Sequence, residues 1–373
     1  MPAETTRKPF HFNRDEIRKL IAMYGTAGLL GVVAWATFLH YQHYYGAAYA
    51  AGGSLAFGFG LRHAFDADHI SAIDDTTRYL MQRGKKRMSV GYFFALGHST
   101  IVVGLSLAIA VSAQTVQHRI PQLEADGANF GAILSGLFLF GIAVLDAFIL
   151  FGLVDVWKKA KAGTYRQDEL DDLMMQRGFI NRIMGSRWRR FVSDSWQMYP
   201  VGVLFGLGFD TATQIALVAL TAAAATGHLG GHGHNAPFGA IIALPLLFTS
   251  GMTIMDTTDG VVMSQAYGWA FLSPFRKVYY NIATVGLGIF VAGAVGSVEF
   301  LQVLSTNAKY HGSVWRDING LDFEQLGYFI VGMFIVLWLA AVFSYRFFHF
   351  EERYGHHGEG APNMLVENEP STQ

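Results

Sequence analysis

The sequence predicts an all-α polytopic membrane protein with eight transmembrane helices and both termini in the cytoplasm. Of its 373 residues, 52% are hydrophobic and only 15% are charged, whereas a soluble domain has about 25% charged residues. The net charge of −1 gives no indication of a nucleic-acid partner. The chain has no cysteine, which excludes disulfides and thiolate metal ligands. Composition therefore indicates the lipid bilayer as the first partner.

Eight apolar stretches justify the helix count, because each is long enough to cross a hydrocarbon layer of about 30 Å. We expect an N-terminal cytoplasmic tail at 1–19, a solvated cytoplasmic loop at 157–198 and a disordered cytoplasmic tail at 349–373. These segments divide the membrane region into helices 1–4 at 20–156 and helices 5–8 at 199–348. The expected crossings are 20–40, 47–73, 89–113, 128–156, 199–226, 237–264, 278–301 and 326–348.

The basic residues predict the orientation of these helices. Lys and Arg gather in the N-terminal tail, in the loop from Arg78 to Arg87, in 157–198 and after the sixth and eighth stretches. Cytoplasmic loops carry an excess of Lys and Arg, so both termini are expected in the cytoplasm. This result requires an even number of crossings, and eight satisfies it. The basic residues that fall elsewhere are Arg62, within the second stretch, and Arg119, Lys309 and Arg316 in the opposite loops.

The second stretch carries the strongest functional signal, the run Arg62-His63-Ala64-Phe65-Asp66-Ala67-Asp68-His69-Ile70. Ionisable side chains are costly inside a membrane, so such a cluster is by default a functional-site hypothesis. Imidazole and carboxylate together suit a borderline divalent metal such as Ni²⁺, Co²⁺ or Zn²⁺. The run therefore predicts a metal site within the membrane.

Polar groups in three further stretches fall at a similar depth. At about 1.5 Å per residue, they lie roughly 10–17 Å from the predicted cytoplasmic ends. Groups from four separate segments at one depth indicate a single site near the midplane of the membrane. The expected metal-binding residues are His63, Asp66, Asp68, His69, His98, Asp210 and Asp256.

Spacing within the second stretch indicates an irregular backbone. On a helix, His63, Asp66 and His69 share a face, but Asp68 lies about 140° from His63. Either Asp68 has another partner, or the helix unwinds around 63–69, which membranes tolerate where the backbone lines a cavity inside the protein. Glycines at 52, 53, 58 and 60 favour a loosened segment.

Simpler roles remain open for several of these groups. A lone His98 could hydrogen-bond a neighbouring helix, and most threonines in the spans are typical helix-to-helix contacts. Asp210, Asp256 and Asp259 need a cation, a proton or a partner, and within the spans only Arg62 is expected to offer a fixed positive charge. The histidines between 228 and 234 either collect metal or form an incidental polar loop.

Two pairs of segments resemble each other and indicate an inverted repeat relating spans 2–3 to spans 5–6. Phe65-Asp66-Ala67 is similar to Phe209-Asp210-Thr211, and Gly97-His98-Ser99-Thr100 is loosely similar to Gly251-Met252-Thr253-Ile254. The predicted orientation places the members of each pair in opposite directions. Substrates of such transporters bind between the repeats at the midplane.

Four ordered motifs resemble the nickel/cobalt transporter (NiCoT) family of secondary permeases: His63-x4-Asp68-His69-Ile70, Leu96-Gly97-His98-Ser99-Thr100, Leu207-Gly208-Phe209-Asp210-Thr211-Ala212-Thr213 and Gly251-Met252-x3-Asp256-Thr257-x-Asp259-Gly260. The resemblance implies an eight-helix permease of the inner (plasma) membrane that takes up Ni²⁺ or Co²⁺ with high affinity. It implies that His63, Asp68 and His69 handle the metal, with His98 close by. One position departs from the family pattern, since Gln214 stands where a Glu is usual.

We therefore expect a metal-importing permease in which the ion is the substrate and no resident cofactor is needed. The sequence has no Gly-x4-Gly-Lys-Ser/Thr loop, so neither ATP hydrolysis by this chain nor an ATPase subunit is indicated. The main alternative is an integral-membrane metalloenzyme, a hydrolase or oxygenase, that uses the same His and Asp cluster. A proton-coupled carrier of another solute is a third interpretation.

Overall fold

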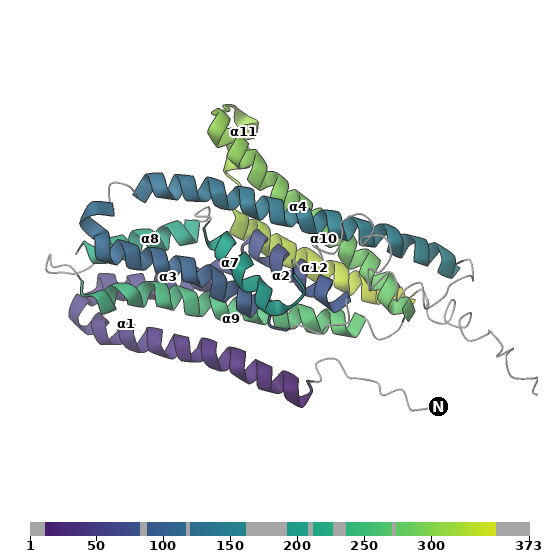
Figure 1. Ribbon diagram of the computed structural model, residues 1–373, viewed down its shortest axis with the longest axis horizontal. Coiled ribbons are helices and arrows are strands. Elements are labelled where there is room, and N and C mark those ends of the chain that lie inside the picture. Colours follow the sequence, from purple (N-terminus) through teal and green to yellow (C-terminus); the bar gives the residue numbers. More distant parts are fainter. Residues whose placement is uncertain are drawn as a thin grey trace, which may run out of the picture.

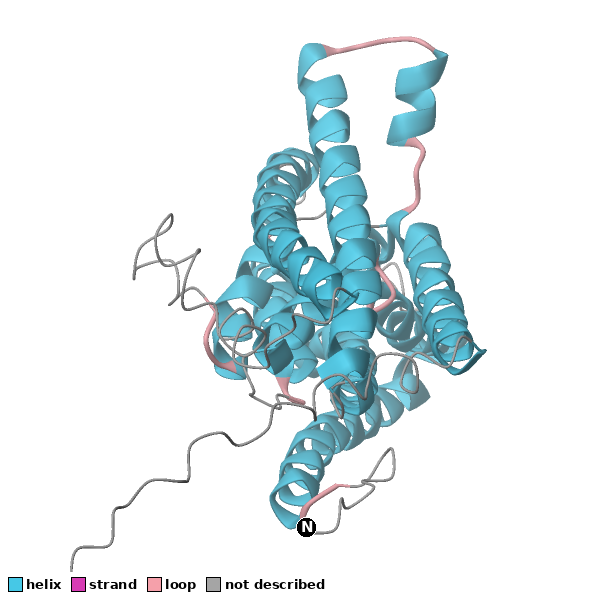
Figure 2. Cartoon of the chain, turned by 90° about the vertical axis from the view of Figure 1, so that its right-hand side faces the viewer, coloured by secondary structure: helices cyan, strands magenta, loops and turns pink. Residues whose placement is uncertain are grey.

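The structure is a computed structural model, and it describes residues 12–82, 88–116, 120–161, 192–207, 212–226, 236–270 and 274–347. Within these ranges the secondary structure consists of helices and turns, with no strand (Figure 2). Five helical segments are long and apolar enough to cross a membrane: Arg14–Tyr45, Val90–Ala108, Ala132–Asp155, Phe238–Gly268 and Ile282–Ala308. The predicted class, an all-α membrane protein, is confirmed.

The long helices run side by side along the longest axis of the molecule (Figure 1). Five predicted crossings each correspond to one helix, with bounds that differ from the prediction by one to eight residues. The elements are α1 (Arg14–His63), α2 (Ala67–Gln82), α3 (Val90–Val116), α4 (Ile120–Lys161), the 3₁₀ helix η1 (Ser195–Gln197), α7 (Met198–Gly206), α8 (Ala212–Ala225), α9 (Phe238–Ala270), α10 (Pro274–Ala308), α11 (Ser313–Asn319) and α12 (Phe323–Phe347).

Helix α1 begins at a capping box. The side chain of Asn13 accepts a hydrogen bond from the backbone N–H of Glu16 at 2.8 Å, and the Glu16 carboxylate accepts one from the backbone N–H of Asn13 at 2.9 Å. These two bonds satisfy N–H groups at the start of the helix that have no partner within it. The sequence therefore specifies this helix start locally.

Helix α1 folds back on itself without a non-helical loop, which corrects the prediction of separate helices at 20–40 and 47–73. The rings of Phe38 and Tyr49 lie 5.3 Å apart, although eleven residues of straight helix advance about 16 Å. Figure 1 shows the chain turning at the left-hand end of α1. The two arms of α1 therefore cross the molecule in opposite directions.

Two predicted crossings are each built from two shorter helices. The chain leaves α1 after His63 and enters α2 at Ala67, and α7 likewise ends at Gly206 before α8 begins at Ala212. At the first break, the N–H of Phe65 donates to the carbonyl of Arg62 at 3.0 Å, and the N–H of Asp66 donates to that of His63 at 2.9 Å. The predicted irregular backbone around 63–69 is therefore confirmed.

Helix α9 lies between the two arms of α1. The Cβ position of Gly31, in the first arm, is 3.8 Å from Cβ of Ser250. In the second arm, a Cβ atom on Gly60 would lie 2.7 Å from the carbonyl carbon of Phe248, so only glycine permits this approach. The apolar core between these helices includes Phe38, Ala56 and Leu247.

Helix α2 is polar but lies inside the bundle, with every residue from Ala67 to Arg78 buried. Arg78 was expected in a cytoplasmic loop, but it is fully buried and forms ion pairs with Asp75 and with Asp146 of α4. Arg62, expected to be the fixed charge within the membrane, is instead 45% exposed and lies 3.4 Å from Asp322. The cost of burying the guanidinium of Arg78 is offset by its two carboxylate partners.

We expect Arg78→Met to destabilise the protein by about 3–5 kcal/mol, because it leaves two buried carboxylates without their cation. The matched control is Arg18→Met, which removes a pair with Asp15 whose side chains are 80% and 81% exposed and whose loss should cost less than about 1 kcal/mol. Unfolding of the purified protein in detergent measures both. Equal effects of the two substitutions would contradict the role assigned to Arg78.

Candidate metal centre

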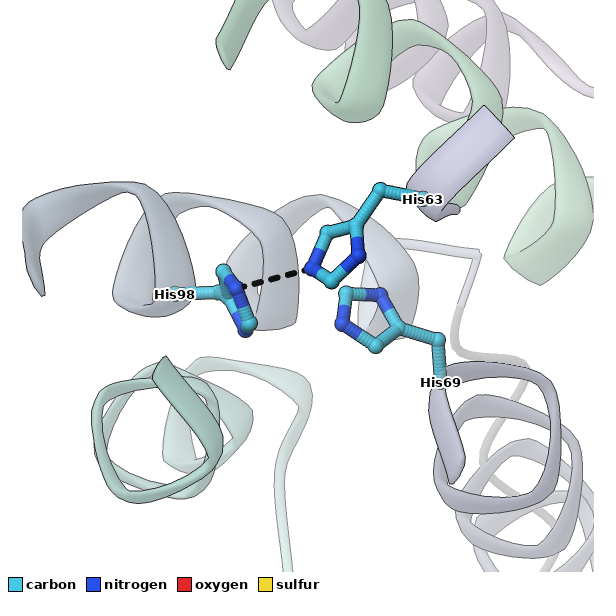
Figure 3. A group of neighbouring side chains, drawn as sticks. All are labelled: His63, His69 and His98. Atoms are coloured by element: carbon cyan, nitrogen blue, oxygen red, sulfur yellow. Dashed lines mark hydrogen bonds between the residues drawn. The ribbon is translucent and has the colours of Figure 1, made fainter. Parts of the chain in front are cut away.

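Three histidines from three helices point toward one another at the centre of the molecule (Figure 3). His63 is the last residue of α1, His69 lies in the first turn of α2, and His98 lies in α3. All three are at most 2% exposed. The Nε2 atoms of His63 and His98 are 3.1 Å apart, and one ring nitrogen from each histidine lies within 4.8 Å of the others.

Two carboxylates lie against the far nitrogens of these rings. An oxygen of Asp66 is 2.6 Å from Nδ1 of His63, and both oxygens of Asp256 are 3.4 Å from Nδ1 of His69. The hydroxyl of Thr213 is also 3.3 Å from Nδ1 of His63. A carboxylate on one ring nitrogen fixes the tautomer and orientation of the ring and leaves the other nitrogen for a metal.

Two ring nitrogens of the cluster are not used in hydrogen bonds with the described residues. Among the residues that the structure describes, Nε2 of His69 and Nδ1 of His98 have no hydrogen-bond partner. A buried polar atom without a partner is costly, so it needs an explanation such as an ion or a water molecule. The donor set, three imidazoles close together, suits a borderline divalent metal ion.

The seven residues expected from the sequence do not all occupy the same place. The structure brings together the three histidines, Asp66 and Asp256. The carboxylate of Asp68 accepts a hydrogen bond from the backbone N–H of His69 at 2.8 Å, and its role in metal binding stays a prediction. Asp210 and the histidines between 228 and 234 lie outside the described residues, so their roles stay predictions.

Aromatic rings surround the histidines, and the sequence reasoning did not identify them. Phe248 lies 5.3 Å from the ring of His63, and Phe94 lies 4.8 Å from the ring of His69, measured between centroids. Such walls keep water away, which strengthens every charge interaction inside. No local pattern distinguishes these two residues from the other phenylalanines of the chain.

Two glycines of α7 allow it to lie directly on the helix that carries His98. A Cβ atom on Gly202 would lie 2.9 Å from the backbone nitrogen of His98, and one on Gly206 would lie 2.9 Å from its carbonyl oxygen. Gly202-x3-Gly206 is a small-residue pattern typical of close helix contacts in membranes, so the sequence did contain a signal for this contact.

Gln214, the position that departs from the family pattern, is 1% exposed on α8. Its side-chain amide donates to the carbonyl of Gly206, the last residue of α7, at 3.5 Å. A deprotonated glutamate has no hydrogen to donate here. The structure therefore gives Gln214 a hydrogen-bonding contact with α7.

A buried three-histidine cluster among apolar helices defines a membrane protein that handles a transition metal ion. The comparisons with known proteins agree with this class. The family model described as "High-affinity nickel-transport protein" (NicO) matches residues 49–344. The chain belongs to this family, which confirms the resemblance found in its motifs.

The similar proteins include both nickel and cobalt transporters. Nickel transporter NixA of Staphylococcus aureus is 39% identical over 302 residues, covering 81% of this chain and 87% of the relative. Nickel transporter NicT of Mycobacterium tuberculosis is 42% identical over 317 residues, covering 83% and 82%. Cobalt transport protein NhlF of Rhodococcus rhodochrous is 39% identical over 349 residues, covering 91% and 96%. No solved structure matches the chain.

These relatives make the chain a nickel/cobalt transporter of a membrane and not an enzyme. The metalloenzyme interpretation of the same His and Asp cluster is not favoured, because the family and the relatives are transporters. The substrate class is a divalent metal ion.

We expect Gly202→Ala to destabilise the protein by about 1–3 kcal/mol, because the added methyl group pushes α7 away from α3. The matched control is Gly104→Ala on α3, where a Cβ atom meets nothing within 4 Å. That substitution should stabilise the helix by about 0.5–1 kcal/mol. Unfolding of both purified variants in detergent measures the difference, and an unchanged Gly202→Ala protein would contradict the close contact.

Proposed function

We propose that the chain is a secondary permease that imports Ni²⁺ or Co²⁺ across the plasma membrane and binds the ion at His63, His69 and His98 on its way. The observation that carries this proposal is the convergence of three buried imidazoles from three separate helices. The relatives, which include nickel and cobalt transporters, support the choice of ion.

The spacing of the nitrogens supports direct coordination. Two nitrogens at about 2.1 Å from one ion and 3.1 Å from each other make an angle of about 95° at the ion. This angle is closer to the right angle of square-planar or octahedral coordination than to a tetrahedron, and Ni²⁺ accepts such geometries. The ion therefore exchanges part of its water shell for imidazole nitrogens.

Asp66 and Asp256 hold the rings and balance the charge. Each carboxylate lies against a histidine, so a bound divalent ion faces two negative charges in a region without water. Asp68 and Asp210 complete the proposed path. Asp68 lies at the start of α2 beside His69, and the family motif around Asp210 precedes α8, which carries Thr213 against His63.

We propose eight crossings with both termini in the cytoplasm. The N-terminal end of α1 and the C-terminal ends of α4 and α12 lie at one end of the molecule, the right-hand end in Figure 1. The basic segments of the sequence join the chain at this end, and the positive-inside bias assigns it to the cytoplasm. The second crossing is then α1 with α2, and the fifth is α7 with α8.

The proposed inverted repeat rests on the similar motifs and on the break between α1 and α2. Phe65-Asp66-Ala67 falls at this break, whereas Phe209-Asp210-Thr211, which follows α7 in the sequence, lies outside the described residues. Discontinuous helices at the midplane are typical of transporters built from inverted repeats.

The membrane potential is a sufficient source of energy for import. It is worth about 2.3 kcal/mol per charge for each 100 mV, and twice that for a divalent ion. A potential that is negative inside drives cations inward. Uptake therefore needs no ATP hydrolysis by this chain.

We expect His63→Ala, His69→Ala and Asp68→Asn each to abolish uptake of ⁶³Ni and ⁵⁷Co, because each removes a group from the proposed binding path. The matched control is His40→Ala, which removes an exposed histidine of α1 and should leave uptake unchanged. Uptake by expressing cells with and without an uncoupler, with the amount of protein in the membrane measured in parallel, tests this. Normal uptake by all three variants would refute the site.

Replacing a ring-holding carboxylate should weaken binding without removing a ligand. We expect Asp256→Asn to lower the affinity for Ni²⁺ by about 10–100-fold, because the orientation and basicity of His69 change. The control is Asp322→Asn, whose side chain is 31% exposed and pairs with Arg62. Calorimetric titration of the purified proteins with Ni²⁺ measures both, and the proposed role fails if the two variants bind equally well.

A further inference from the structure

A cavity between α2, α4 and α7 lies apart from the histidine cluster. Its volume is about 240 Å³. Its walls include Leu137, Phe138 and Gly141 of α4 and Phe205 of α7. The two polar side chains of its lining, Thr76 and Tyr79, both come from α2, so the rest of the wall is apolar.

The cavity is continuous with the lipid-facing surface of the protein. Its α4 residues belong to the segment Ala132–Asp155, which is long and apolar enough to cross a membrane. Leu137, in the cavity wall, is 57% exposed. Val144 and Phe151 follow at intervals of seven residues on the same helix face and are 50% and 74% exposed. Leu137 therefore belongs at once to the cavity wall and to the face of α4 that meets the hydrocarbon.

This cavity offers too few polar partners to hold a water molecule, and leaving it empty costs dispersion energy. A water molecule needs two to four polar partners, and an apolar cavity of about 150 Å³ already stays dry and takes up benzene or xenon. An empty space leaves its lining atoms without dispersion contacts on one side. Inside a bilayer, the apolar material at the mouth of the cavity is the acyl chain of a lipid.

We propose that this cavity binds an acyl chain of a bilayer phospholipid, which enters from the exposed face of α4 beside Leu137. The chain fills the gap between α4 and α7 and covers the polar helix α2 from that side. Thr76, which lines the cavity, lies seven residues after His69 on the same helix, so the lipid packs against the helix that carries the metal-binding histidine. The proposal requires only that the protein lies in a membrane, and its test involves no metal.

The test is photo-crosslinking of the full-length protein in nanodiscs of phosphatidylcholine that carries a diazirine on one acyl chain. Mass spectrometry of the digested protein then locates the adducts. We expect adducts on Phe138, which lines the cavity and is only partly exposed, as well as on the exposed Phe151. Adducts on Phe138 at background level would overturn the proposal.

The decisive variant is Gly141→Leu, because a Cβ atom at this position meets nothing within 4 Å and the added side chain occupies the cavity. Adducts on Phe138 should fall by about fivefold or more as the space is filled, while those on Phe151 stay unchanged. The matched control is Gly332→Leu on α12, where a Cβ atom also has open space.

A second variant provides an independent test in case Gly141→Leu does not fold. Leu204→Trp fills the same cavity from α7 and should lower the same adducts. Adducts on Phe138 that persist at the wild-type level in a folded Gly141→Leu or Leu204→Trp protein would overturn the proposal, since the lipid would then contact Phe138 from outside the cavity.

Discussion

The break between α1 and α2 is the constraint on which the rest of the site depends. Six residues of straight helix separate His63 from His69 by about 9 Å along the axis, but their rings lie 4.7 Å apart, centroid to centroid. Only an interrupted backbone brings them this close. In lipid, an interruption is tolerated only where protein covers it. Turn hydrogen bonds at Phe65 and Asp66 satisfy part of the backbone, and α12 covers the rest.

Part of the charge in this fold lies inside the helical bundle. Helix α2 places acids and one arginine in the centre of the bundle and leaves the apolar helices to face the lipid. The guanidinium of Arg78 lies between Asp75 and Asp146 and joins α2 to α4. Asp74 accepts a hydrogen bond from the hydroxyl of Tyr267 at 2.6 Å and joins α2 to α9. The helix that begins beside the histidines is therefore fixed to its neighbours by polar contacts that lipid cannot replace.

Much of this arrangement follows from the sequence alone. The low charge content identifies the class, and the ionisable residues inside an apolar stretch identify His63, Asp66 and His69 as site candidates. Their positions relative to one another depend on the break at residues 64–66. The burial of Arg78 was missed because counting basic residues by loop ignores partners, and its partner Asp146 lies on a distant helix. The crossings 20–40 and 47–73 were predicted separately, because the sequence does not show that the chain stays helical while it reverses direction between them. The Gly202-x3-Gly206 pattern indicates a close helix contact, but local sequence does not specify that α3 is the partner.

The last helix lies on the backbone that the histidines need. A Cβ atom on Gly327 would lie 2.7 Å from the carbonyl carbon of Phe65, and the ring of Tyr328 lies 5.0 Å from that of Phe65. An added side chain would not fit between α12 and this interruption, so the start of α12 forms the wall behind residues 64–66, although it lies some 260 residues later in the sequence.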